Sequence, residues 1–168
     1  MTTEAQKPQP TPEFAVHYRN FMVERLRQEH ATTAKVFAAL RDGEWRPDPK
    51  SRSARELAWH IASSERWFIN SIAKVSFAPA DEGKPPATVA EAYDSGFAPA
   101  LEQLNKLTGE QLLAIVDFFG MKMPLYLMLD FCHVHTVHHR GQLATYLRPL
   151  GGKVPDIYGG SADEPFQM

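Results

Sequence analysis

The segment from Met128 to Tyr146 constrains the fold more than any other part of this sequence, because its polar and apolar residues share one helical period. Residues recur in it at alternating spacings of four and three: Met128, Cys132, His135, His139, Gln142 and Tyr146. This is the period of a core-facing helix seam, so the segment predicts a long helix with two inward histidines. Pro124 precedes the segment and Pro149 follows it, so we expect this helix to run from Pro124 to about Arg148.

Three more amphipathic helices are expected before this one. Their starts are indicated by helix-capping patterns: Thr11 followed by Pro12, Ser53 paired with Glu56, and Thr88 paired with Glu91. The first helix should end before Asp42-Gly43. Residues 108–123 show no clear period, although Gln111–Val116 could form a helical turn and Val116–Gly120 a short extended piece, so we interpret them as a connector.

These helices predict an all-α protein, a four-helix bundle in a single domain. Residues 1–10 are expected to be a flexible lead-in, residues 11–150 the bundle, and residues 151–168 an irregular tail. The links between the second, third and fourth helices are long, so they permit either an up-down or a crossover topology. The spacing of the elements does not choose between the two.

Composition limits the partners and the cellular location. The 168 residues carry a formal net charge of −2, and no cluster of Lys and Arg could follow a phosphate backbone, so nucleic acid is not expected as a partner. The first residues lack the apolar stretch of a secretory signal, and no run is apolar enough to span a membrane. Cys132 is the only cysteine, so no internal disulfide is possible. We therefore expect a cytoplasmic protein with no membrane partner.

The histidines point to a metal. His135 and His139 are one helical turn apart on the inner seam, so both imidazoles can reach one divalent transition metal ion. A third ligand must come from another helix, and His60 lies at the edge of the inner face of the helix that starts at Ser53, next to Ile61. Periodicity alone leaves alternatives, namely hydrogen-bonded core histidines or polar residues on a solvated helix face.

The other histidines and the cysteine have simpler interpretations. His133 and His138 lie off the seam, so we expect them to face solvent or to support the ligands. His30 points inward on the first helix and is expected to be a hydrogen-bonded core histidine. Cys132 lies one turn from His135 and could ligate a metal, but a small buried cysteine needs no such role.

Several segments together resemble one known family. The run 135–142 is similar to the HxxHHRGQ signature of DinB/YfiT-like metal-dependent enzymes, and Leu57-Ala58-Trp59-His60 is similar to their histidine segment on the second helix. The residues Trp45-Arg46-Pro47 and the run 150–159 add to the match, which covers most of residues 14–160. The resemblance implies a four-helix bundle with a crossover connection, a homodimer, and a metal held by His60, His135 and His139.

Two residues beside the ligands have open roles. Gln142 is one turn beyond His139 and either orients a ligand or forms a buried hydrogen bond between helices. Arg140 is about 100° around the helix from His139 and either holds an anionic substrate or pairs with a carboxylate across an interface.

Three histidine ligands would leave at least one coordination position open, which is typical of catalytic sites. We therefore predict a metal-dependent transferase or hydrolase that activates a thiol or water for a small-molecule substrate, with zinc or nickel as the metal. The resemblance adds that some relatives are S-transferases or isomerases that use low-molecular-weight thiols. The alternative is a non-catalytic metal-binding bundle of the stress response. No recognisable catalytic triad or phosphate-binding loop accompanies the histidines, so the reaction stays unnamed.

Overall fold

The computed structural model describes residues 9–41 and 44–166, and most of its regular structure is helical. In chain order the elements are α1 (Pro12–Ala39), α2 (Ala54–Lys74), α3 (Val89–Ser95), α4 (Phe97–Leu104), α5 (Gly109–Leu113), β1 (Ile115–Phe118), β2 (Met121–Pro124), the 3₁₀ turn η1 (Leu125–Leu127) and α6 (Met128–Tyr146). Most of the predicted N-terminal lead-in, residues 1–8, lies outside the described residues, as do Asp42 and Gly43. No helix in the described part of the chain is long and apolar enough to cross a membrane.

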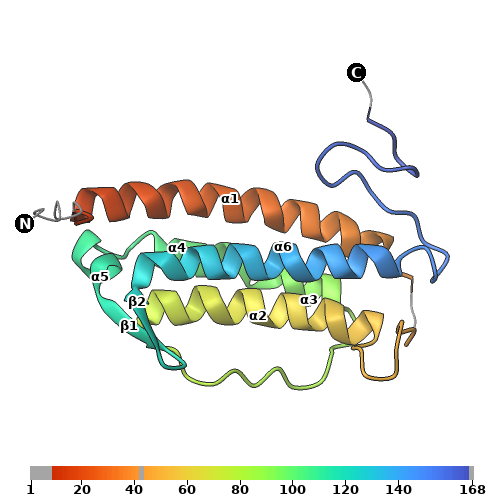
Figure 1. The fold of residues 1–168 in the computed structure, drawn as a ribbon, viewed down its shortest axis with the longest axis horizontal. Helices are drawn as coiled ribbons and strands as arrows, with labels where there is room; N and C mark the ends of the chain where they lie inside the picture. Colours follow the sequence, from red (N-terminus) through yellow and green to blue (C-terminus); the bar gives the residue numbers. More distant parts are fainter. Residues whose placement is uncertain (1–8, 42–43, 167–168) are drawn as a thin grey trace, which may run out of the picture.

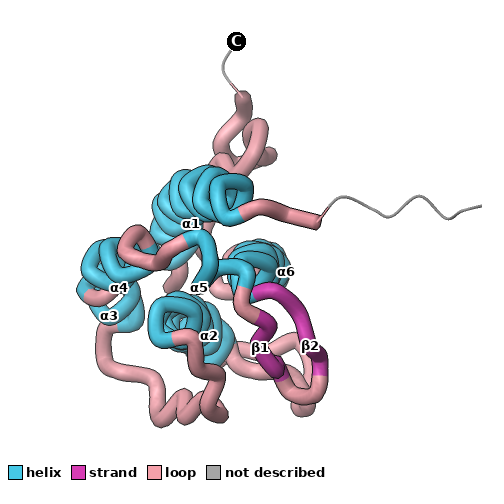
Figure 2. Tube along the Cα trace, turned by 90° about the vertical axis from the view of Figure 1, so that its left-hand side faces the viewer, coloured by secondary structure: helices cyan, strands magenta, loops and turns pink. Residues whose placement is uncertain are grey.

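The helices lie along one long axis. α1, α2 and α6 run side by side, and α3 and α4 follow one another beside them (Figure 1). Seen end-on, these helices surround a common centre (Figure 2). α2 runs opposite to α1, and residues 76–88, which we call the strap, then return along the outside of α2 before α3 begins (Figure 1). As a result, α2 and the α3–α4 pair run in the same direction.

Side chains of α2 hold the strap in place by donating hydrogen bonds to its backbone carbonyls. The donors and acceptors pair in antiparallel order: Trp67 Nε1 with Ala78 O at 2.9 Å, Trp59 Nε1 with Glu82 O at 2.6 Å, and Arg55 Nη2 with Pro86 O at 2.8 Å. These bonds satisfy carbonyl groups that have no partner in a sheet or helix. They also fix the middle of the strap, and with it Glu82, against the first half of α2.

The starts of the first two helices are confirmed. Thr11 Oγ1 accepts a hydrogen bond from the backbone N–H of Phe14 at 3.2 Å, at the start of α1. Ser53 and Glu56 form both bonds of a capping box at the start of α2, at 3.3 Å and 2.7 Å. In both cases the cap satisfies amide groups that have no acceptor inside the first turn.

The predicted third helix is wrong in two respects. Thr88 makes no capping hydrogen bond, and the helix is divided at Gly96 into α3 and α4. Pro99 explains the division, because its ring would clash with the carbonyl of Ser95 in a continuous helix. Starting a new helix at Phe97 places the proline in a first turn, where its missing N–H is not needed.

The stretch interpreted as a connector contains regular structure. Thr108 and Gln111 form a capping box that starts α5, and β1 pairs with β2 in an antiparallel hairpin. Phe119 and Gly120 make the turn, both with positive φ, as a tight two-residue hairpin requires. The predicted start of the last helix at Pro124 is wrong, because this proline pairs with Ile115 as the last residue of β2.

The core has a polar layer between two apolar clusters. One cluster includes Leu26, Ile69 and Met128, and the other includes Val36, Ile61 and Leu143. Along α1, α2 and α6, buried polar residues fall between the two clusters: Glu29, Thr33, Glu65, Thr136 and Arg140. Burying polar and charged groups is costly unless they pair, so this layer must be internally hydrogen-bonded. On α6, His135 and His139 lie next to Thr136 and Arg140, at the level of this polar layer.

Candidate metal centre

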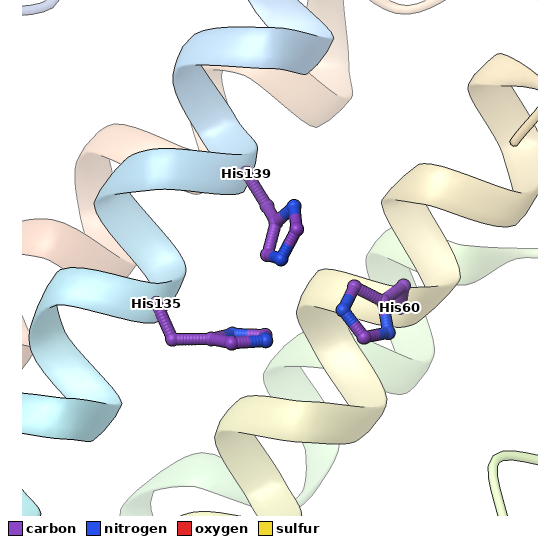
Figure 3. Close-up of side chains that lie close together, drawn as sticks. All are labelled: His60, His135 and His139. Carbon is purple, nitrogen blue, oxygen red and sulfur yellow. The ribbon is translucent and has the colours of Figure 1, made fainter. Parts of the chain in front are cut away.

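Three histidines from two helices converge at the level of the polar layer. His60 projects from α2, and His135 and His139 project from successive turns of α6 (Figure 3). One nitrogen from each ring can be chosen so that all three lie within 4.8 Å of one another. The ring centroids are 4.4 to 5.0 Å apart. The three residues predicted as ligands are therefore brought together.

His60 is oriented by a carboxylate from the strap. Its Nδ1 lies 2.6 Å from Oε1 of Glu82, and Ser64 Oγ is 3.4 Å from the same nitrogen. Because Nδ1 faces these oxygens, Nε2 is the nitrogen left to bind an ion. A carboxylate on the outer nitrogen of a histidine is the usual support for a metal ligand, since it fixes both the tautomer and the ring orientation.

Glu82 is itself held on two sides. Its other carboxylate oxygen accepts a hydrogen bond from Arg52 Nη1 at 3.0 Å, and its backbone carbonyl accepts one from Trp59. Burial alone would raise the pKa of Glu82, but the hydrogen bonds and charges of His60 and Arg52 lower it below its ordinary value. The group is therefore a carboxylate near neutral pH. Sequence reasoning missed it, because a loop residue 22 positions from His60 carries no periodic signal.

The two histidines of α6 differ in their surroundings. His139 Nδ1 lies 2.8 Å from Gln142 Oε1, so the predicted supporting residue does contact a ligand. His135 makes no hydrogen bond with the described residues, and its Nδ1 is fully buried. Burial and the neighbouring histidines lower the pKa of His135 to about 4, and burial lowers that of His139 as well. Both rings therefore favour the neutral form, which is the form that binds metals.

This environment fits a divalent transition metal. Neutral imidazole nitrogens are the donors that zinc, nickel, copper and iron accept, and no charged ligand has to be desolvated. The unpartnered Nδ1 of His135 costs stability in a buried place, and an ion bound to that nitrogen would remove the cost. Nitrogens bound to one ion at roughly 2.1 Å lie no more than about 4.2 Å apart, so small ring rotations bring the three within range.

Arg140 lies on a different face of α6 from the ligands, the face that contacts α1. Its guanidinium is 1% exposed and donates to Glu29 Oε2 of α1 at 2.6 Å. It also donates to Thr33 Oγ1 at 3.4 Å and to the hydroxyl of Tyr158 from the tail, which in turn donates to Glu29. Two roles were considered for Arg140, and the geometry matches the second. Arg140 pairs with a carboxylate across the interface between α6 and α1 of the same chain.

His30 is a hydrogen-bonded core histidine, as predicted. Its Nδ1 is 3.0 Å from Glu65 Oε1, and its Nε2 is 3.0 Å from Asp94 Oδ1. The ring is stacked between Tyr93 and Phe97, with centroids 3.9 and 3.6 Å away. The Glu65 carboxylate therefore has a hydrogen-bond partner inside the core. His30 takes no part in the metal centre.

The remaining predicted residues stay outside the ligand group. Cys132 is fully buried, and burial raises the pKa of its thiol, so it behaves as an apolar core residue. His133 points toward the buried ion pair, with its Nε2 3.6 Å from Glu29 Oε1. His138 is exposed, although its ring centroid is 4.8 Å from that of His139.

A hollow opens beside His139 between α2 and α6. Its volume is about 540 Å³, and its lining includes Arg52, Leu57, His139, Gly141, Gln142 and Tyr146. We call it the His139 hollow. Of the three histidines, His139 is the one that lines it, so a small molecule in the hollow would lie beside this ring.

Comparisons with known proteins found one matching family and two related sequences. The family model described as the DinB family matches residues 15–166 of the chain. An uncharacterized protein of Bacillus subtilis strain 168, YrdA, is 30% identical over 145 residues, which cover 81% of this chain and 85% of YrdA. A second uncharacterized protein of that strain, YjoA, is 28% identical over 112 residues, covering 64% of this chain and 73% of YjoA.

Solved structures show the same fold. The crystal structure of a DinB-like protein from Bacillus cereus ATCC 10987 superposes with a TM-score of 0.68 at 27% identity, covering 82% of this chain and 95% of that one. The crystal structure of YjoA from Bacillus subtilis gives a TM-score of 0.69 at 24% identity, with coverages of 88% and 99%.

Proposed function

Because this chain belongs to the DinB family, we propose that it is a metal-dependent enzyme whose His60, His135 and His139 hold one divalent transition metal ion. One observation carries the proposal: nitrogens of these three side chains lie within 4.8 Å of one another. They are the only group of three or more potential ligands of this kind among the described residues. Three protein ligands leave a coordination position for a substrate.

The residues around the site have separable tasks. Glu82 and Gln142 hold the rings of His60 and His139 through Nδ1, so that each Nε2 is available to the ion. Burial keeps His135 neutral. A metal ion bound here supplies Lewis acidity, which makes a thiol or a water molecule a better nucleophile near neutral pH. We propose that the reaction is a transfer or a hydrolysis of this type.

The His139 hollow favours an enzyme over a purely structural metal site. A structural metal is normally closed off by four protein ligands, whereas this centre offers three and has open space beside one of them. The alternative function is a non-catalytic metal-binding bundle of the stress response. It predicts bound metal without turnover in any assay of thiol conjugation or ester hydrolysis, whereas the proposed enzyme loses a measurable activity when a chelator removes the metal.

Elemental analysis of protein purified without a histidine tag tests the metal centre. We expect about one transition metal per chain, and replacing any of the three ligands with Ala should lower metal affinity by orders of magnitude. His133→Ala is the matched control, since that side chain faces Glu29 rather than the site. Equal metal content in the wild type and the His135→Ala/His139→Ala double variant would refute the proposal.

The same proposal covers the topology of the helices, the identity of the metal, the cellular location and the partners. We interpret the architecture as a four-helix bundle in which α3 and α4 together act as the third helix and the strap is the crossover connection. Zinc or nickel is the proposed metal, since both accept three imidazole ligands. The proposed location is the cytoplasm, with a small-molecule substrate and with neither nucleic acid nor membrane as a partner.

We also propose a homodimer through faces of α1 and α6. Phe21 on α1 is 57% exposed and Phe131 on α6 is 39% exposed. Exposed aromatic side chains of this size favour contact with a second protein surface. Light scattering at micromolar concentration measures the mass directly, and a monomer mass would rule the dimer out.

A further inference from the structure

The His139 hollow has a chemical character that narrows the class of substrate. Its polar lining residues include Arg52 and Gln142. Its apolar lining residues include Leu57 and Tyr146. Such a surface matches a molecule that carries a negative group on a short apolar chain.

Arg52 has donors to spare for a ligand. A guanidinium carries five N–H donors, and the single hydrogen bond that this side chain makes with the described residues runs from Nη1 to Glu82 at 3.0 Å. The side chain is 47% exposed, and its other N–H groups make no hydrogen bond with the described residues. The planar guanidinium can therefore keep Glu82 and bind a second carboxylate at the same time.

Gly141 supplies a second, independent observation. It lies inside α6 and lines the hollow, and a Cβ added there would meet no atom within 4 Å. A glycine inside a helix is less stable than alanine by about 1 kcal/mol, and no packing among the described residues explains it here. Its effect is to leave free space along the backbone of α6 where that backbone lines the hollow.

We propose that the His139 hollow is the substrate subsite of the metal centre, and that it binds a carboxylate carried on a short apolar chain. Arg52 anchors the carboxylate, the chain lies along Gly141 and against Tyr146, and the reactive end reaches the histidines. The inference rests on the proposed metal-dependent function, because it concerns the part of the substrate that does not touch the metal.

The test uses full-length protein loaded with cobalt(II), whose near-ultraviolet charge-transfer absorption reports a thiol sulfur on the metal. The probes are two pairs of equal length, 3-mercaptopropionate with 3-mercapto-1-propanol and 6-mercaptohexanoate with 6-mercapto-1-hexanol. We expect the carboxylate of at least one pair to bind about tenfold more tightly than its neutral partner, as a charge-assisted hydrogen bond provides. Arg52→Gln should reduce this preference to less than about twofold.

Arg46→Gln is the matched control, because Arg46 is also exposed and paired with a glutamate, 3.4 Å from Glu56, yet it does not line the hollow. It should keep the full preference. Cobalt affinity is measured for each variant, so that an indirect effect of Arg52 through Glu82 and His60 is separated from ligand binding. An unchanged preference in Arg52→Gln, or equal affinities within both pairs, would overturn the inference and leave the metal centre intact.

Gly141→Ala tests the free space separately. The variant should melt at the same temperature or higher, since alanine favours the helix, yet bind both six-carbon thiols at least about threefold more weakly. Unchanged thiol binding would show that the hollow is not the subsite. Absence of any thiol absorption in the cobalt-loaded wild type would refute the thiol-activating form of the proposed function, and the inference with it.

Discussion

Glu82 is the residue whose replacement best separates support of a ligand from ligation itself. Its carboxylate lies 2.6 Å from His60 Nδ1 and makes no hydrogen bond with His135 or His139. The side chain can be removed without releasing the strap, because Trp59 binds the backbone carbonyl of Glu82 rather than its carboxylate. Glu82→Ala should therefore leave the fold in place and loosen only the ring of His60.

The expected loss is modest but measurable. Replacing the outer partner of a metal-bound histidine lowers metal affinity by roughly 10-fold to 100-fold, or about 1.4 to 2.7 kcal/mol. Glu82 is 28% exposed, and Ser64 Oγ remains 3.4 Å from the same nitrogen, so the lower end applies. We expect about tenfold for Glu82→Ala. Glu82→Gln should lose only about threefold, since its amide oxygen can still accept the N–H while the charge is gone.

Competition with a chromophoric zinc chelator at pH 7.5 measures these affinities. Asp81→Asn is the matched control, because it removes the same charge from the neighbouring residue and keeps an oxygen for the Gly83 amide that Asp81 caps at 3.0 Å. It should bind zinc within twofold of the wild type. Affinities for Glu82→Ala and wild type that agree within twofold, with both proteins melting alike without metal, would refute the role assigned to Glu82.

Two further predictions concern stability. Glu29→Ala leaves the guanidinium of Arg140 buried without its partner at 2.6 Å, so urea unfolding should show that the free energy of unfolding falls by about 3 to 5 kcal/mol. The control Glu24→Ala replaces an exposed glutamate and should lower it by less than about 0.5 kcal/mol. Equal losses in the two variants would contradict the prediction. In metal-free protein, burial and the neighbouring histidines lower the pKa of His135 to about 4, whereas an unfolded histidine titrates near pH 6.5. As the pH is lowered, the unfolded state therefore takes up the proton first, and stability should fall as the pH drops from about 6.5 toward 4. In thermal melts, the melting temperature should fall more steeply with pH in the wild type than in His135→Gln. Equal slopes would show that His135 is not held neutral.

Local sequence patterns were sufficient wherever the physical cause is local. The caps of α1 and α2 depend on residues three apart, and the inward register of His135 and His139 depends only on the helical period. For that reason the helical class and the inward register of His135 and His139 could be predicted from periodicity, whereas the metal triad with His60 came from the family resemblance. The same reasoning succeeded for His30, because an inward histidine on an apolar stripe must find hydrogen-bond partners.

Some local features were available and were not recognised. Thr108 and Gln111 have the spacing of a capping box, and Pro99 is incompatible with an unbroken helix through Ser95. The hairpin that ends at Pro124 is harder to predict, since its strands are only four residues each and the flanking helix pattern suggests a helix start. Short strands gain their stability from packing against the helices, and a local sequence pattern does not predict such packing.

Contacts between distant segments were decided only by the tertiary structure. Glu82 reaches His60 because three side chains of α2 hold the strap against the helix. The strap has no periodic residue pattern, so its sequence does not predict which of its residues contacts the helix. Arg140 could have faced a substrate, but burial made an unpaired guanidinium too costly, and the carboxylate that compensates it is on α1, 111 residues away. The sequence by itself determined which residues face inward; the packing of the helices determined which of them meet, because the free energy of a buried polar group depends on its partner.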